Sequence, residues 1–454
     1  MARWRWGWLA AFAGAAAGAG AAGCDWRDVD KDAQDTPVLS VGAPDKFASK
    51  DDFGKITLPI AAPSETDGIT SRLLVSSSHA TALALIELDA AGHATTTNID
   101  SPVFNSANGP DGYAFNAVAE IPGPKPGRVL LGAAKLMTGN SGVYTVSLGG
   151  THEGTVVVVT ADATADPYLG LGVAAGTFAG VGDPAKPEYI VASADVMRVY
   201  VDEAPTPMWS WPDATSGSTC PLSIPSPPGA TGDARAVPNS RPVLVGHFWG
   251  AGSDLQIAIA NFGQVGKGSL SFFSLGAAGL GCLGTITGAE PGFGAAVSAG
   301  DFNGDHNTDL IVGAPPSAAY VFFGPLGTGS TGVPLTVDAT QAVQFGASVA
   351  SCNLEGTGND QAIVGDPGAT SSGDLLAGAA QMFSFEGTGA AVSPKKGRLL
   401  AAHDPSANAA YGASVASLPF CGTCAAPAAP RLPAVGASTR VLMYFTLGTD
   451  LRKR

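Results

Sequence analysis

The chain has 454 residues, of which 45% are hydrophobic and 14% charged, so it holds enough apolar side chains for an extensive core. Its 61 glycines and 33 prolines are spread along the whole chain, which favours many short strands joined by turns over long helices or disorder. The formal net charge of −14 argues against nucleic acid as a partner, because phosphate binding needs a basic face.

The first 23 residues have the pattern of a secretory signal. Arg3 and Arg5 precede an Ala- and Gly-rich apolar run that is too short and too weakly hydrophobic to hold a stable membrane span. The segment AAGC at residues 21–24 resembles a bacterial lipobox, in which the cysteine becomes the lipidated N-terminus. We therefore expect residues 1–23 to be a lipoprotein-type signal peptide and Cys24 to be the lipidation site. An ordinary signal peptide followed by a chance cysteine is the alternative.

Residues 24–37 are short and charged, which is typical of a tether between a lipid and a folded domain. These N-terminal features predict an exported lipoprotein that faces the periplasm or the cell surface. They also predict that the protein contacts the membrane through its N-terminal lipid only. The choice between the inner and the outer membrane stays open.

From residue 53 onward the sequence repeats. The clearest unit is PGFGAAVSAGDFNGDHNTDLIVGAPPSAAYVFFGPLG, at residues 291–327. Such a unit begins with an aromatic residue and Gly, alternates as a strand, breaks at a polar loop and resumes as an apolar strand that ends in Gly. Units start near residues 53, 115, 169, 237, 293, 345 and 411. Each is long enough for about four strands, the size of a propeller blade, and such units must pack side by side to bury their faces.

The aromatic-Gly start and the DxNxDxxxD loop followed by GAP resemble the FG-GAP repeat of integrin α-chain propellers and of many bacterial surface proteins. Residues 293–316 match this pattern closely, residues 345–367 and 411–438 match it moderately, and the first four units share its rhythm. The resemblance implies an all-β fold over residues 38–454, a seven-bladed β-propeller of four-stranded antiparallel blades. The extended segment VLSVGAPDK that precedes the first unit is a candidate for the closing strand of the last blade.

One loop carries a pattern of metal ligands. Its side chains place oxygen atoms at alternating positions, and they are Asp301, Asn303, Asp305 and Asp309, with Asn307 between the last two. Hard cations such as calcium bind six to eight oxygens, and closely spaced carboxylates are typical of such a site. The family resemblance implies a calcium loop in which the four side chains donate oxygens and Asn307 donates its backbone carbonyl. A solvated turn rich in Asp and Asn is the alternative.

This loop is not an EF-hand, since His306 occupies the sixth position, where an EF-hand has Gly, and Val312 occupies the twelfth, where it has Glu. The next unit has lost most of the pattern. Its ligand positions hold Asn353, Glu355, Thr357 and Gln361. With a single carboxylate in this loop, the sequence leaves open whether residues 353–361 bind a metal. We expect calcium, where bound, to be structural.

The cysteines and tryptophans allow more than one interpretation. Export permits disulfides, so Cys220 and Cys282 are a candidate pair across a long segment, while Cys421 and Cys424 form a CxxC that suits a local bridge or two thiols. A Pro-rich run over residues 204–242 contains Trp209 and Trp211. These rings are either contact residues for a ligand or are packed against the edge of a blade.

Sequence motifs give no support for an enzyme. The chain contains no G-x-S-x-G elbow, no P-loop and no HExxH, and its six histidines are scattered. We therefore expect no catalytic residues and a monomeric, lipid-anchored binding or adhesion protein with structural calcium, whose partner is a protein or glycan at the cell envelope. A scaffold subunit of an envelope complex is the alternative, followed by a hydrolase or lyase that uses the axial pocket.

Overall fold

The protein is described by a computed structural model. The residues described are 38–42, 53–54, 56–60, 69–76, 83–89, 93–99, 115, 117–123, 127–133, 141–148, 155–162, 166, 168–181, 183, 186–212, 220–222, 240–261, 267–290, 292–337, 343–354, 359–370, 377–387, 392–401, 409–419, 431–437 and 440–444. The chain divides into two compact units, residues 1–36 and 37–454. The predicted signal peptide, Cys24 and the tether lie outside the described residues, as do Cys421 and Cys424.

Every sheet in the second unit has four strands, and all of their pairings are antiparallel. Blade 1 comprises β2 (Ile56–Ile60), β3 (Ile69–Ser76), β4 (Leu83–Asp89) and β5 (Ala94–Ile99). Blade 2 comprises β6 (Ala117–Glu120), β7 (Arg128–Ala133), β8 (Ser141–Ser147) and β9 (Thr155–Asp162). Blade 3 comprises β10 (Gly172–Gly176), β11 (Glu188–Ala192), β12 (Met197–Val201) and β13 (Trp209–Trp211). Blade 4 comprises β14 (Val243–Gly246), β15 (Gln256–Asn261), β16 (Ser269–Gly276) and β17 (Gly279–Thr287).

Blade 5 comprises β18 (Ala296–Gly300), β19 (Asp309–Ala314), β20 (Ala318–Phe322) and β21 (Val333–Leu335). Blade 6 comprises β22 (Ser348–Cys352), β23 (Gln361–Asp366), β24 (Ala379–Glu386) and β25 (Ser393–Leu400). Blade 7 takes three strands from the C-terminal end, β26 (Ser414–Pro419), β27 (Arg431–Gly436) and β28 (Arg440–Tyr444). Among the described residues no helix is long and apolar enough to cross a membrane.

The fourth strand of blade 7 comes from the start of the described chain. Strand β1 (Val38–Gly42) pairs with β28, with Val38 opposite Tyr444 and Gly42 opposite Arg440. This pairing confirms the sequence prediction of a closing strand before the first unit. The all-β fold and the seven blades of four antiparallel strands are likewise confirmed.

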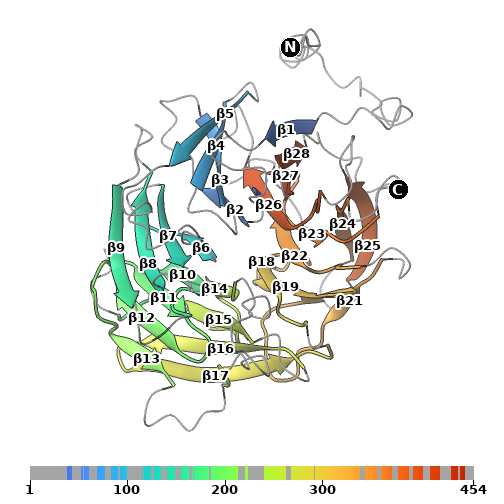
Figure 1. Ribbon diagram of the computed structural model, residues 1–454. Coiled ribbons are helices and arrows are strands. Elements are labelled where there is room, and N and C mark those ends of the chain that lie inside the picture. The colour runs from blue at the N-terminus through green and yellow to red at the C-terminus, as the bar shows by residue number, and fades with distance from the viewer. Residues whose placement is uncertain are drawn as a thin grey trace, which may run out of the picture. The chain divides into compact units, whose positions relative to one another are not determined.

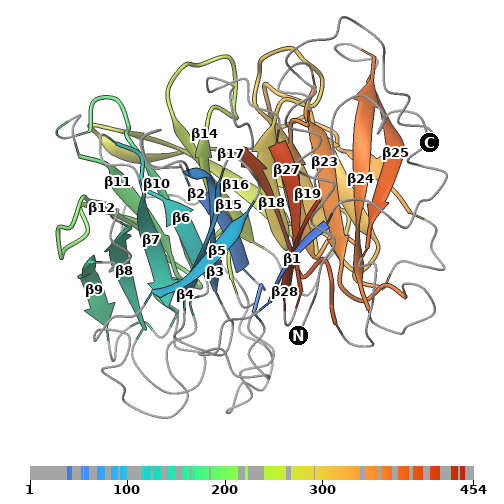
Figure 2. The ribbon, with the colours of Figure 1, turned by 90° about the horizontal axis from the view of Figure 1, so that it is seen from above.

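The blades follow one another in chain order around an axis (Figures 1 and 2). The first strand of each blade contacts the first strand of the next, from β2 through β6, β10, β14, β18 and β22 to β26, which in turn contacts β2. The chain therefore forms a closed ring of sheets. Among these inner strands, β10, β18 and β22 are rich in Ala, Gly, Ser and Val, whose small side chains allow the sheets to approach closely near the axis.

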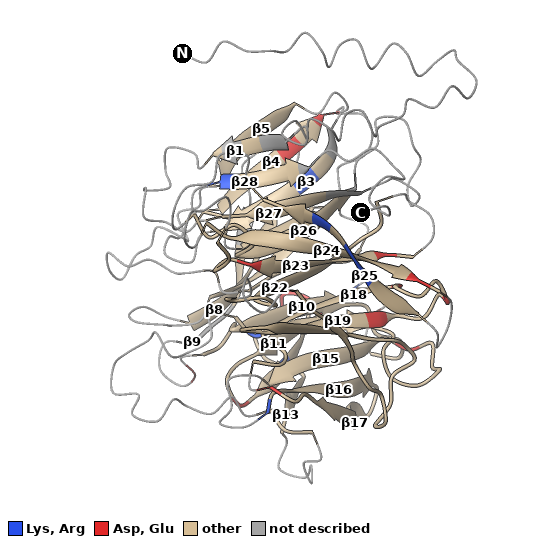
Figure 3. Cartoon of the chain, turned by 90° about the vertical axis from the view of Figure 1, so that its right-hand side faces the viewer, with Lys and Arg blue, Asp and Glu red and all other residues tan. Residues whose placement is uncertain are grey.

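The hydrophobic core is divided among the junctions between neighbouring blades. Successive side chains of a strand point to opposite faces, and β19 shows the result. Leu310 and Val312 pack with residues of blade 4 such as Phe272, while Ile311 packs with residues of blade 6 such as Phe345. Charged side chains are sparse on the strands (Figure 3). Since the second strand of a blade is apolar on both faces, the repeats read as apolar runs in the sequence.

At four of these junctions, from blade 2 to 3, 5 to 6, 6 to 7 and 7 to 1, a glycine near the end of the second strand contacts a glycine at the start of the next blade. Gly346 follows the aromatic residue that starts blade 6, has φ of +95°, and would place a Cβ only 2.2 Å from the carbonyl oxygen of Ala318 in blade 5. At the junction that closes the ring, a Cβ on Gly436 would lie 1.9 Å from the carbonyl oxygen of Gly54. Neither position has room for a side chain, so glycine is required where one blade's start meets the preceding blade.

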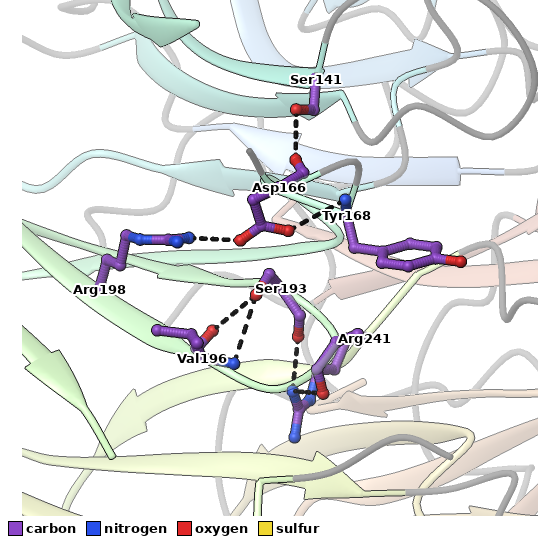
Figure 4. Close-up of polar contacts among 8 residues, drawn as sticks. Ser141, Asp166, Tyr168, Ser193, Val196, Arg198 and Arg241 are labelled. Atoms are coloured by element: carbon purple, nitrogen blue, oxygen red, sulfur yellow. Dashed lines mark hydrogen bonds and ion pairs between the residues drawn. The ribbon is translucent and has the colours of Figure 1, made fainter. Parts of the chain in front are cut away.

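Polar contacts at the same end of the blades, where the second strands finish, join blades 2, 3 and 4 (Figure 4). The carboxylate of Asp166 accepts a hydrogen bond from Arg198 at 2.6 Å, and its carbonyl accepts one from the hydroxyl of Ser141. Arg241 lies fully buried and donates to the carbonyls of Ser193 and Leu222, among others. Burial lowers the pKa of Arg241 to about 9. The acceptors of its described hydrogen bonds are neutral oxygens, which satisfy the buried guanidinium, and the charge of Asp195 opposes the effect of burial on its pKa.

The connection between blades 3 and 4 is attached to the core in the parts that the structure describes. Cys220 and Cys282 form a disulfide, as the sequence suggested for this pair. Trp211 is 6% exposed and packs edge-on against Phe273, and Trp209 contributes to the same core cluster. Packing is therefore confirmed for Trp211, while Trp209 is partly buried against the same cluster and its contact with a ligand stays a prediction.

We expect the substitution Gly436→Ala to destabilise the protein by roughly 1–3 kcal/mol, because a methyl group cannot fit against the backbone of blade 1. Thermal unfolding followed by circular dichroism would measure the loss. Gly329→Ala is the matched control, since a Cβ there has nothing within 4 Å. Equal melting temperatures for the two variants would contradict the proposed role of the glycine contact.

Candidate metal centre

The candidate metal loop connects β18 to β19 in blade 5. The five residues predicted as ligands, Asp301, Asn303, Asp305, Asn307 and Asp309, all lie within this connection. Gly300 pairs with Asp309 across the two strands, so the loop is a hairpin whose two ends are held side by side. The sheet therefore brings together Gly300 and Asp309, which are nine positions apart.

Side chains of this loop fold back onto its own backbone. Asp301 accepts hydrogen bonds from the N–H groups of Gly304 at 2.7 Å and His306 at 3.0 Å. Asn303 accepts one from the N–H of Asp305, whose carboxylate accepts one from Asn307 in turn. Asp and Asn favour such local turns because their short side chains reach the backbone two or three residues on. The result is a tight loop in which successive oxygens are held by the backbone.

Asp309 is the buried member of the set. Its side chain is fully inaccessible and accepts the N–H groups of Phe302 at 2.8 Å and Gly324 at 2.7 Å. Burial raises the pKa of Asp309 to about 7, and the neighbouring carboxylates of Asp305 and Asp301 raise it as well. For Asp305, burial is outweighed by hydrogen bonds from Asn307 and Asn303, which lower its pKa. The two carboxylates therefore have opposite electrostatic surroundings within one loop.

His306 takes a backbone conformation that favours glycine. Its φ is +64°, and its side chain is 94% exposed. The ring nitrogen Nδ1 lies 3.6 Å from a carboxylate oxygen of Asp301, and within the described residues this is the one basic group paired with the three aspartates. The strained position is sustained by the bond from the His306 N–H to Asp301.

The donor chemistry of the loop suits a hard cation, because three carboxylates and an amide oxygen lie on one turn. Asn303 is 3% exposed, so it shares the buried side of the loop with Asp309. Among the described residues, however, no group of three or more His, Cys, Asp or Glu side chains is placed to hold a metal ion. The calcium site therefore stays a prediction that rests on the kind and number of oxygen donors.

Sequence reasoning missed Asp360, which links this loop to blade 6. Its carboxylate accepts the N–H of Asp301 at 3.0 Å, and its own N–H donates to the carbonyl of Asp301 at 2.7 Å. Asp301 is thus held on both sides by a residue of the next blade. Because Asp360 aligns with Thr308 of blade 5, the repeat pattern contains no signal that would have found it.

The position of Asp309 in the repeat is polar in six blades. It is the residue of the second strand that precedes the apolar run, and the series is Arg72, Arg128, Glu188, Gln256, Asp309 and Gln361. Aligning these apolar runs would have revealed the series from sequence, although not its partners.

The two arginines of this series have acidic partners. Arg72 forms a buried ion pair with Glu87 at 2.7 Å. Arg128 donates to Glu203 at 2.9 Å and to the hydroxyl of Tyr189, both in blade 3. Burial raises the pKa of Tyr189, consistent with a neutral phenol inside this network. In these two blades a guanidinium occupies the position where blade 5 has a carboxylate.

The loop at residues 353–361 is described in part. Asn353 and Gln361 lie within the described residues, while Glu355 and Thr357 lie outside them. Gln361 accepts the N–H of Leu354 at 3.0 Å and donates to the carbonyl of Asn359 at 2.7 Å. Both ends of its amide group are therefore engaged within the loop.

Comparison with protein families identifies the repeat. A closed ring of seven four-stranded blades defines a β-propeller. The model of the FG-GAP repeat family matches residues 293–332, which contain the first three strands of blade 5, β18 to β20, and the candidate metal loop. The protein is therefore a seven-bladed β-propeller that contains an FG-GAP repeat. No match to the sequence is found among curated proteins.

Glu188, the blade 3 member of the series, offers a test of this position. It is fully buried, and one oxygen accepts the N–H of Phe178 at 2.9 Å. The other oxygen has no hydrogen-bond partner among the described residues. Burial raises the pKa of Glu188, so the folded state binds its proton more tightly than the unfolded state does. The stability that this confers is lost as the pH rises through the raised pKa.

We expect Glu188→Gln to stabilise the protein by roughly 1–3 kcal/mol above the raised pKa, because a neutral amide avoids an unsatisfied buried charge. The gain should disappear below the ordinary pKa of a glutamate. Urea unfolding at several pH values would measure it. Asp254→Asn, at an exposed turn, is the control. A gain of equal size at all pH values would contradict the assignment to the Glu188 carboxylate.

Proposed function

We propose that this protein is an exported, lipid-anchored binding or adhesion protein of the cell envelope, with calcium in a structural role. The observation that carries the proposal is the closed seven-bladed ring with an FG-GAP repeat in blade 5. A rigid ring presents the connections between its strands on two faces, and such loops on a fixed framework suit recognition. The partner would be a protein or a glycan at the envelope.

The surroundings of the perturbed titratable groups support binding over catalysis. Arg241, Tyr189 and Glu188 lie buried and bond to backbone or side-chain groups of the blades themselves. Asp366 likewise accepts the N–H groups of Val343 and Gln344, and burial raises its pKa. Each of these groups serves the framework, so we propose that the protein is not an enzyme. A hydrolase or lyase that uses the axis of the propeller is the less favoured function.

Calcium in this proposal binds at the loop of residues 301–309. Asp301, Asn303, Asp305 and Asp309 would hold the ion together with the carbonyl of Asn307. When bound, the cation would supply positive charge to the three aspartates and stabilise the folded state, because it binds only the folded loop. Asp360 would position Asp301 from the next blade. No chemical step is assigned to the ion.

The N-terminal lipid is the membrane contact in this proposal. We expect Cys24→Ser to release the protein from the membrane fraction, because a serine cannot accept the thioether-linked lipid. Fractionation of cells that express each form, with detection of the protein in both fractions, would measure this. Persistent membrane association of the variant would contradict lipidation at Cys24.

The binding function is tested by affinity capture with the full-length protein in detergent. We expect the immobilised protein to retain a glycan or a surface protein from envelope extract, and to lose it when the propeller is unfolded by heat. Capture is compared in calcium and in chelator. One protein retained at equal stoichiometry in both conditions would instead favour the scaffold function. No retention from any envelope fraction would contradict both.

A further inference from the structure

One position of the repeat behaves alike in four consecutive blades. The first residue of the second strand in blades 3 to 6 is Glu188, Gln256, Asp309 or Gln361. Each side chain turns back and accepts the N–H of the apolar residue that begins its loop. The donors are Phe178, Phe248, Phe302 and Leu354, at N···O distances of 2.9, 3.0, 2.8 and 3.0 Å. This bond closes the loop whatever the chemical identity of the acceptor.

Blades 5 and 6 share the geometry of this closure. The donor precedes the acceptor by seven residues in both loops, from Phe302 to Asp309 and from Leu354 to Gln361. The acceptor also pairs with the last residue of the first strand in both blades, which is Gly300 in one and Cys352 in the other. The ends of the two loops are therefore closed in the same way in the described residues, and the acceptors differ by an amide in place of a carboxylate and by one methylene.

Gln361 and Asp309 differ in the second polar atom of the side chain, which is an amide nitrogen in Gln361 and a carboxylate oxygen in Asp309. Gln361 donates its amide to the carbonyl of Asn359, two residues before it. In blade 5 the residue two positions before Asp309 is Asn307, whose carbonyl is the backbone ligand in the proposed calcium site. Asp309 is a carboxylate that only accepts, from Phe302 and Gly324. The amide of Gln361 thus donates to the carbonyl of Asn359 in blade 6. The equivalent carbonyl in blade 5, that of Asn307, is the one that would bind the cation.

Blade 4 shows a second version of the amide. Gln256 accepts the N–H groups of Phe248 and Trp249 with one oxygen, and its amide nitrogen donates to the carbonyl of Trp249 at 2.8 Å. One amide oxygen can therefore accept two backbone donors at this position. This matters for blade 5, where two N–H groups share the carboxylate of Asp309.

We propose that the side-chain amides of Gln256 and Gln361 take the place of a cation in their loops, so that Asp309 confines the calcium dependence of the chain to blade 5. This inference rests on the calcium binding proposed above. The physical basis is that an amide carries both an acceptor and a donor, whereas a carboxylate carries only acceptors. A loop closed by glutamine is complete and neutral at this position. A loop closed by aspartate, beside two more carboxylates, leaves negative charge that a bound cation balances.

The test compares the full-length wild type with Asp309→Gln and Asp309→Ala. We expect the wild type to bind one calcium ion per chain and to melt at a higher temperature in calcium than in chelator. Asp309→Gln should lose the whole calcium-induced shift, yet in chelator it should melt at or above the wild-type temperature. Asp309→Ala should also lose the calcium-induced shift, and in chelator its melting temperature should lie below those of the wild type and Asp309→Gln. Isothermal titration with calcium and thermal unfolding provide the two measurements.

Gln361→Ala serves as the matched variant in blade 6. We expect it to lower the melting temperature by the same amount in calcium and in chelator, with the stoichiometry unchanged at one ion per chain. A loss of bound calcium in this variant would overturn the inference, as would a wild-type stoichiometry above one.

The two proposals fail in different ways. A wild type that neither binds calcium nor shifts in melting temperature would sink the calcium site. The role of the amide would then be decided in chelator alone. A higher melting temperature for Asp309→Gln than for Asp309→Ala in chelator would support the role of the amide. Equal melting temperatures of the two variants would overturn that role.

Discussion

The fold depends on close backbone contact between the start of one blade and the second strand of the blade before it. Glycine makes this contact possible on both sides, as Gly436 and Gly54 do where blade 7 meets blade 1. The hydroxyl of Ser414 adds a hydrogen bond of 2.6 Å to the carbonyl of Gly54 at the same junction. The same glycine contact recurs at four of the seven junctions, which explains why the Gly at the start of a unit and the later Gly recur in those units. The glycines of the FG-GAP pattern therefore lie where neighbouring blades contact each other.

The same pattern explains how much of the structure was predictable. Blade number, strand number and the closing strand follow from the local repeat pattern. Cys220 and Cys282 were a candidate pair because export permits disulfides and the two cysteines span a long segment, and they form a disulfide. Contacts between side chains of different blades leave no pattern in the local sequence from which they could be predicted. Glu203 reaches Arg128 from the next blade, and the bond from Asp360 to Asp301 likewise crosses a junction. The burial of Trp211 depends on Phe273 in blade 4. Each of these requires knowledge of which faces meet.

The polar position at the start of the second strands shows one framework supporting several chemistries. Arg72 forms an ion pair with a buried carboxylate, and the amides of Gln256 and Gln361 bond to backbone groups. Glu188 accepts a hydrogen bond from a single backbone N–H. The buried polar groups at this position make at least one hydrogen bond or ion pair in each of these blades, although the partner differs from blade to blade. Blades of one ring can therefore differ in their dependence on ions and pH while their strands keep the same register.

The closing strand also has a mechanical meaning. Strand β1 is the first strand of the propeller in the chain, so tension applied from the N-terminal side reaches the ring through β1 and its partner β28. When pulled along its length, an antiparallel strand loads its ladder of hydrogen bonds in shear, and the bonds resist together instead of opening one at a time. In a protein held at its N-terminus, the strand that closes the ring is thus also the strand that carries the load. Rupture of β1 from β28 would leave blade 7 with the three strands β26, β27 and β28.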